Sequence, residues 1–244
     1  MISKYDLEYK EGLFLDLHLP HSEQFDLFVY FHGGGLVSGE RGGVEVFAKT
    51  LAEHNVATAT VDYRMYPEAK FPDFIDDGAS AIHWLKDNIS SYGECKRIFV
   101  GGSSAGGYIS MMLCFDSHYL EKVGMKPTDI SGYIHDAGQP TAHFNVLRER
   151  GIDRRRVVVD ESAPMYYVGL ADEYSPMMFI VSDNDMACRY EQTMLMVKTL
   201  NRFGHTDGIH LTVMHGEHCS YVYETGPDGQ GVFGRLVLSL INKL

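Results

Sequence analysis

Two adjacent serines in the segment GGSSAGG, residues 101–107, offer a hydroxyl that could act as a nucleophile. The segment follows the apolar run RIFVGG and precedes AGGYISMMLCF, which is typical of a helix. A nucleophile at such a strand-to-helix turn needs very small residues two positions before and after it, because the backbone is crowded there. Gly102 and Gly106 give Ser104 this frame, G-x-S-x-G, and the same frame excludes Ser103.

A serine hydroxyl attacks a carbonyl group only with a general base beside it and an acid that orients the base. The segment HGEHCS offers His215 and His218, and we favour His218 because it lies beyond the strand-like run HLTVMHG. The segment SDND supplies Asp183 and Asp185 after the preceding strand-like run. We favour Asp185, which lies further into the loop, and expect Asp183 to brace the turn. The order Ser, Asp, His then gives a triad of Ser104, Asp185 and His218.

A tetrahedral intermediate also needs backbone N–H donors for its oxyanion. The motif HGGG, which opens with His32 and Gly33, ends the apolar run FDLFVYF. Its glycines allow the backbone to approach a substrate carbonyl closely. An ordinary loop is the alternative interpretation of this motif.

The elements that must position these residues follow from alternating patterns along the chain. Short apolar runs alternate with longer amphipathic stretches, which predicts a mostly parallel sheet with helices on both faces. The strand-like runs are residues 25–31, 57–63, 97–102, 130–137, 177–183 and 210–216. Residues 7–20 alternate as an antiparallel edge strand does. Residues 137–176 are too long for a simple connection, and they predict a small lid before the strand that carries the catalytic acid.

The length, charge and cysteine content of the chain indicate what kind of protein it is and which partners it does not bind. The length of 244 residues fits one α/β domain, residues 1–244, with no repeat or linker inside it. A formal net charge of −12 argues against binding to nucleic acid or to an anionic membrane. We see no signal peptide and no run of apolar residues that could span a membrane, so we expect a cytoplasmic protein. Four cysteines without CxxC spacing indicate free thiols and no metal site; they are Cys95, Cys114, Cys188 and Cys219.

Several charged residues have both a structural and a functional interpretation. The basic run RERGIDRRR, residues 148–156, is expected to form a solvated face; the alternative is an anchor for a substrate carboxylate. Asp62 and Arg64 are expected to brace the loop behind HGGG. His135 and His143 are expected to be loop histidines with ordinary hydrogen bonds.

The motifs HGGG, VDYRMYPEAKFP and GGSSAGG, in this order, resemble the hormone-sensitive-lipase-like branch of α/β-hydrolase esterases. The resemblance spans residues 27–220 and extends to small bacterial acetyl-esterases and carbohydrate esterases. It implies the α/β-hydrolase fold, a Ser–His–Asp triad, and an oxyanion hole formed by the backbone N–H groups of Gly34, Gly35 and Ala105. The chain departs from the family pattern in two ways: Ser103 stands where many members have an acidic residue, and the usual N-terminal cap helices are missing.

The residues and the resemblance together predict a serine carboxylesterase that hydrolyses short-acyl, acetyl-like esters of small molecules. Acetylated sugars are among the candidate substrates. An amidase, formamidase or peptidase would use the same triad, and a non-catalytic ligand-binding member of the fold is the alternative from another class. The chemistry needs neither a metal ion nor an organic cofactor. The expected partner is a small-molecule ester, with no nucleic acid and no membrane, and a homodimer is left open.

Overall fold

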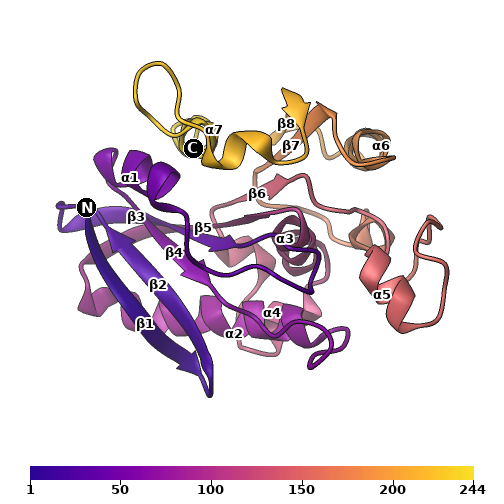
Figure 1. The fold of residues 1–244 in the computed structure, drawn as a ribbon, viewed down its shortest axis with the longest axis horizontal. Helices are drawn as coiled ribbons and strands as arrows, with labels where there is room; N and C mark the ends of the chain where they lie inside the picture. The colour runs from indigo at the N-terminus through magenta and orange to yellow at the C-terminus, as the bar shows by residue number, and fades with distance from the viewer.

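Eight strands form one sheet in the computed structural model, which describes residues 1–244 (Figure 1). The strands are β1 (Ile2–Lys10), β2 (Leu13–Leu19), β3 (Gln24–Phe31), β4 (Val56–Val61), β5 (Glu94–Ser103), β6 (Gly132–Asp136), β7 (Met177–Asn184) and β8 (Ile209–Glu217). Their order in the sheet is β1-β2-β4-β3-β5-β6-β7-β8. The pairs β1–β2 and β2–β4 are antiparallel, and every other pair is parallel.

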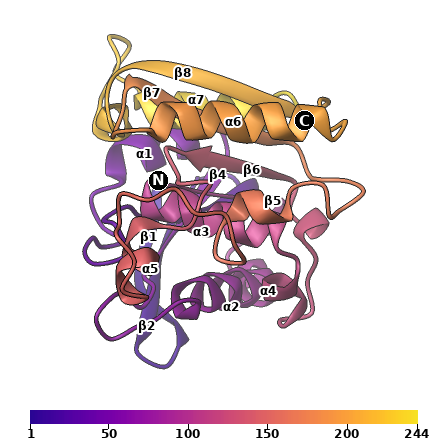
Figure 2. The same ribbon diagram turned by 90° about the vertical axis from the view of Figure 1, so that its right-hand side faces the viewer.

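Helices cover both faces of this sheet, which confirms the predicted α/β class. The α-helices are α1 (Glu45–Glu53), α2 (Asp73–Asn88), α3 (Ala105–Phe115), α4 (His118–Glu121), α5 (Phe144–Glu149), α6 (Arg189–Arg202) and α7 (Val232–Ile241). The short 3-10 helices are η1 (Ile89–Ser91), η2 (Pro127–Asp129), η3 (Pro164–Tyr167) and η4 (Ser220–Tyr223). Helices α1 and α7 pack together on one face, and α2 lies beside α4 on the other (Figures 1 and 2). None of the helices is long and apolar enough to cross a membrane.

The hydrophobic core has two parts, one on each face of the sheet. The larger cluster of 41 buried residues includes side chains of α2, α3 and α6, and the smaller cluster of 18 includes those of α1 and α7. Strand β4, VATATV, is buried at all six positions because helices cover it on both sides. The central strands are therefore held rigidly, and the loops at their carboxyl ends are positioned by them.

The N-terminal segment differs from the single edge strand expected for residues 7–20. The chain reverses at Gly12, where φ is +71°, so the segment contributes to two strands, β1 and β2. Glycine adopts this conformation without a steric penalty, which explains the turn. The pairing of β1 with β2 shifts register between Lys4 and Leu7 and again between Glu8 and Lys10. The free edge of the sheet on this side is therefore β1, and it is irregular.

The stretch 137–176 connects β6 to β7 and contains α5 and η3. Its first seven residues, 137–143, are buried. Its role as a lid stays a prediction.

Candidate active site

Ser104 lies between β5 and α3 in a conformation that few residues adopt, with φ 56° and ψ −110°. Such backbone geometry costs on the order of 1–3 kcal/mol and persists only where the surroundings enforce it. A Cβ atom on Gly106 would lie 1.9 Å from the carbonyl oxygen of Phe31. A Cβ atom on Gly102 would lie 2.5 Å from the carbonyl carbon of Gly106. Both glycines of the G-x-S-x-G frame are thus required by packing.

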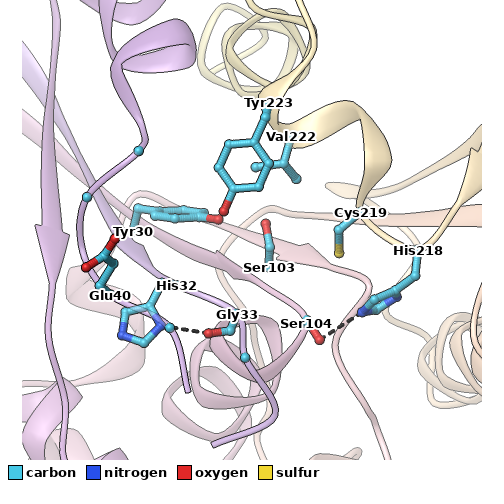
Figure 3. A pocket seen from close by; sticks show the side chains of 14 residues that line it. Tyr30, His32, Gly33, Glu40, Ser103, Ser104, His218, Cys219, Val222 and Tyr223 are labelled. Atoms are coloured by element: carbon cyan, nitrogen blue, oxygen red, sulfur yellow. Dashed lines mark hydrogen bonds between the residues drawn. The ribbon is translucent and has the colours of Figure 1, made fainter. Parts of the chain in front are cut away.

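The structure brings Ser104, His218 and Asp185 together. The Nε2 atom of His218 lies 2.8 Å from the Oγ atom of Ser104 (Figure 3), and its Nδ1 atom lies 2.5 Å from Oδ1 of Asp185. His218 follows the last residue of β8, and Asp185 follows the last residue of β7. One imidazole therefore bridges the hydroxyl and the carboxylate through its two nitrogen atoms.

The surroundings of Asp185 keep its carboxylate charged. Burial raises the pKa of Asp185, but the hydrogen bond to His218 and the backbone N–H groups of Met186 and Ser182 outweigh burial, so the pKa lies below its ordinary value. The N–H group of Met186 donates to Oδ1 at 2.7 Å. An ionised carboxylate fixes the histidine tautomer and stabilises the imidazolium that forms during catalysis.

The other two candidates, Asp183 and His215, form a separate pair. Nδ1 of His215 lies 2.7 Å from Oδ2 of Asp183, and the His215 side chain is 98% exposed. The N–H group of Gly216 donates to Oδ1 of Asp183 at 3.0 Å. Asp183 therefore braces the turn, as expected, and its histidine faces solvent.

The HGGG motif is held in a defined path by His32. Burial lowers the pKa of His32, so the ring is neutral near pH 7 and Nδ1 can donate to the carbonyl oxygen of Gly33, 2.7 Å away. The ring stacks on Tyr63 with 4.4 Å between centroids. The amide of Asn145, in α5, donates to the carbonyl oxygen of Gly35 at 2.6 Å. The motif is thus fixed from both ends.

Three backbone N–H groups near Ser104, those of Gly34, Gly35 and Ala105, donate no hydrogen bond to another protein group. A Cβ atom on Gly33 would lie 3.4 Å from Cβ of Ser104, so the motif passes directly beside the serine. Ala105 is the first residue of α3, where the helix dipole is positive. Unpaired donors beside a nucleophile are what an oxyanion hole requires.

The buried carboxylate of Asp136, which no sequence motif indicated, supports the serine turn from β6. Its Oδ2 accepts a hydrogen bond from Oγ of Ser103 at 2.5 Å, and its Oδ1 accepts one from the hydroxyl of Tyr221. Its backbone carbonyl accepts the N–H of Ser104 at 2.8 Å. Burial raises the pKa of Asp136 to about 6, although the two hydroxyl groups oppose this shift. The only signal in the sequence was an acid at the end of an apolar strand.

A cavity of about 490 Å3 opens beside Ser104 and His218 (Figure 3). Tyr30 and Tyr223 border it on the side away from His218, and the hydroxyl of Tyr30 is buried without a hydrogen-bond partner. Cys219 also lines the cavity, and burial raises the pKa of its thiol, so this group is a poor nucleophile at neutral pH. No group of three or more His, Cys, Asp and Glu side chains is arranged to hold a metal ion.

The charged pair expected behind HGGG has structural contacts. Asp62 forms an ion pair with Arg41, which lies in the loop that follows the motif. Arg64 forms an ion pair with Asp77 of α2 at 2.8 Å. Both residues brace the loops around the motif.

The two remaining histidines differ from the expectation in one respect. His135 lies within the buried strand β6 rather than in a loop, because the apolar run continues through it, and its Nδ1 lies 2.9 Å from Oγ of Ser110. His143 is in the loop before α5 and accepts the N–H of Asn145 at 3.2 Å.

Comparison with known proteins places the chain in a family. The family described as alpha/beta hydrolase fold matches residues 28–199, more than half of the chain, and the chain belongs to it. The 3-O-acetylpapaveroxine carboxylesterase CXE2 of Papaver somniferum is 33% identical over 142 residues, which are 49% of this chain and 44% of that protein. Carboxylesterase NlhH of Mycobacterium tuberculosis is 35% identical over 96 residues, 37% of this chain and 29% of that protein. The chain thus matches less than half the length of these relatives.

Solved structures share the fold over nearly the whole chain. Esterase B from Lactobacillus rhamnosis has a TM-score of 0.80 at 17% identity, covering 99% of this chain and 85% of that one. The Est2 esterase of Thermogutta terrifontis has a TM-score of 0.76 at 20% identity, covering 97% and 90%. The arrangement of the sheet is therefore that of the α/β-hydrolase fold.

Proposed function

We propose that this protein is a serine carboxylesterase acting on small-molecule esters. The observation that carries the proposal is the imidazole of His218, which bridges Ser104 and Asp185 beside three unpaired backbone N–H groups. The names of the relatives, carboxylesterases in both cases, support the same reaction class.

The geometry supports a two-step reaction through an acyl-enzyme. His218 accepts the proton of Ser104 as Oγ attacks the carbonyl carbon of the ester, and the N–H groups of the oxyanion hole stabilise the charged oxygen. His218 then gives the proton to the leaving alcohol as the C–O bond breaks. Water attacks the acyl carbon in the second step, with His218 accepting its proton and returning it to Ser104. Asp185 stays ionised throughout and holds the imidazole in place.

We propose further that the acyl group is short and the substrate small and polar, with acetylated sugars as candidates. The cavity beside the serine is bordered by the side chain of Glu40 and by the hydroxyl group of Tyr223. A long alkyl chain would desolvate these groups without pairing them. Sugar hydroxyls can form hydrogen bonds with them.

A fluorophosphonate probe tests the proposed nucleophile. Mass spectrometry is expected to find the probe on Ser104 in the wild type and to find none on the S104A variant. Hydrolysis of p-nitrophenyl acetate and p-nitroacetanilide then separates an esterase from an amidase. A wild type that neither reacts with the probe nor hydrolyses either compound would make the chain a ligand-binding member of the fold.

A p-nitrophenyl ester series tests the short-acyl proposal. The value of kcat/KM is expected to fall from butyrate to decanoate, because methylenes beyond the cavity gain little burial. Highest activity on decanoate would instead indicate a groove for long acyl chains.

A further inference from the structure

A second cavity, of about 520 Å3, lies between the 137–176 stretch and the start of α6. The cavity is positively charged, because four of its 11 lining residues are arginines and none is acidic. The arginines are Arg154, Arg155, Arg156 and Arg189. In a chain with a net charge of −12, such a cavity concentrates positive charge at one place.

Two of these arginines are free to bind a ligand. Arg155 forms an ion pair with Asp153 at 2.6 Å, which occupies its guanidinium. Arg154 and Arg156 form no ion pair and no side-chain hydrogen bond, and both are exposed. Planar guanidinium groups bind carboxylates through two parallel hydrogen bonds.

The fourth arginine, Arg189, is only 4% exposed and has no carboxylate within ion-pair distance. Its guanidinium donates to the carbonyl oxygen of Ala137 and, at 3.5 Å, to Oε1 of Gln139. A buried cation without an acidic partner is costly, and an anion in the cavity would reduce that cost. The start of α6 adds to this effect, since Cys188 lines the cavity and gives the helix no side-chain cap.

Two residues that line the cavity contact the proposed catalytic machinery. Met186 lines it, directly after Asp185, and the Met186 N–H group donates to the carboxylate of Asp185. Phe144 also lines it, and its ring is 3.4 Å from the position that a Cβ atom would occupy on Gly35. The cavity therefore lies next to both the acid of the triad and the oxyanion loop.

We propose that this cavity binds a carboxylate group of the ester substrate, so that the natural substrates are carboxylate-bearing esters. The proposal rests on the proposed esterase function and names its substrate class. The carboxylate belongs either to the acyl part, as in a hemiester of a dicarboxylic acid, or to the alcohol part, as in the ester of a hydroxy acid. Both kinds of ester place a negative charge a few bonds away from the scissile carbonyl.

Two matched pairs of esters test the proposal. Monoethyl glutarate and ethyl pentanoate differ by a carboxylate on the acyl side; 4-acetoxybenzoate and 4-acetoxybenzamide differ by one on the alcohol side. In at least one pair, the wild type is expected to show about tenfold higher kcat/KM for the carboxylate ester, mainly through KM. The pair that shows the preference identifies the side that enters the cavity.

The double variant R154Q/R156Q is expected to lower that preference ratio about tenfold. The variant R148Q is the matched control, because Arg148 belongs to the same basic run and also forms no ion pair but lies outside this cavity. R148Q should keep the wild-type ratio, and thermal unfolding checks that all variants fold. Equal kcat/KM within both pairs, or a ratio that R154Q/R156Q leaves unchanged, overturns the proposal. Failure to hydrolyse any of the four esters would contradict the esterase function instead.

Discussion

Adjacent residues of the same type have different partners in this protein. Oγ of Ser104 faces His218, whereas Oγ of Ser103 donates to the buried carboxylate of Asp136. The register of β5 against β6, which pairs Ser103 with Asp136, sets this division. The two serines can therefore be told apart by substitution.

We expect S104A to abolish hydrolysis of p-nitrophenyl acetate with no loss of stability, because only the nucleophile is removed. S103A should keep most of the activity but lower the free energy of unfolding by about 1–3 kcal/mol, because a buried carboxylate loses a hydrogen bond. Initial rates and urea unfolding measure the two effects. The reverse pattern would assign the nucleophile to Ser103.

The two acids after β7 should differ just as strongly. D185N is expected to lower kcat by about a thousandfold or more, because the amide disfavours the histidine tautomer that the reaction needs. D183N should change kcat less than about threefold, since its partner His215 is 98% exposed and forms no hydrogen bond with Ser104 or Asp185. Steady-state measurement of kcat for both variants on one ester identifies the acid of the triad. Equal losses of kcat in D185N and D183N would contradict the assignment to Asp185.

Asp136 should make stability depend on pH. Burial raises its pKa from 3.8 to about 6, so the folded state binds its proton more tightly than the unfolded state. Its contribution to the free energy of unfolding is therefore full below about pH 4 and is lost as pH rises to about 6, a change of about 3 kcal/mol. The difference in unfolding free energy between wild type and D136N, measured from pH 4 to 7.5, should fall over this range. A flat difference would contradict a raised pKa.

The active site depends on how a few elements meet. The serine turn comes from β5 and α3, the acid and base follow β7 and β8, and α5 holds the HGGG motif through one hydrogen bond. Parallel strands bring their carboxyl ends to one edge, so residues separated by more than a hundred positions meet there.

The contact from α5 gives a test at this scale. N145D keeps the volume of Asn145 but removes the donor to the Gly35 carbonyl oxygen, and it places a carboxylate beside that oxygen. We expect kcat to fall about tenfold with KM within about twofold, because the oxyanion donors lose their alignment. N88D serves as a control, since Asn88 makes a comparable hydrogen bond to a carbonyl in α2. Unchanged kcat in N145D would mean that the motif holds its shape without α5.

Sequence patterns predicted the elements and the residues whose roles depend on local spacing. The frame around Ser104 and the positions of His218 and Asp185 after strands could be recognised because each depends on a few neighbouring residues. The partners of Asp136 could not, since Tyr221 reaches it from a 3-10 helix 85 positions later. The burial of Arg189 could not be predicted either, because a helix-forming pattern does not show which of the arginines in the helix is buried.

For the molecule as a whole, the charge of the cavity opposes the charge of the chain. With a net charge of −12, the protein repels an anionic substrate at long range, whereas Arg154 and Arg156 attract it at contact.

Raising NaCl from about 0.02 M to about 0.5 M should lower the wild-type preference for carboxylate esters, because salt screens the exposed arginines. In R154Q/R156Q the two exposed, unpaired arginines are removed and buried Arg189 remains, which salt screens less, so the same salt should change the ratio less than in the wild type. Parallel salt dependences in the two proteins would contradict this account. Esterase assays on the matched pairs at several salt concentrations measure it.

The irregular strand at the free edge of the sheet has a consequence for the behaviour of the folded protein in concentrated solution. An edge strand exposes a row of unpaired backbone groups onto which the edge of another molecule can add. In β1 the two register shifts interrupt that row of backbone groups. Asp6, at the first shift, has a φ of 56°, which is not an extended conformation. Lys4 and Lys10 flank the interruptions. Bulges and lysines at an edge prevent a second strand from pairing in a continuous register. The sheet therefore ends at β1, and this side of the molecule resists the edge-to-edge growth that leads to aggregates.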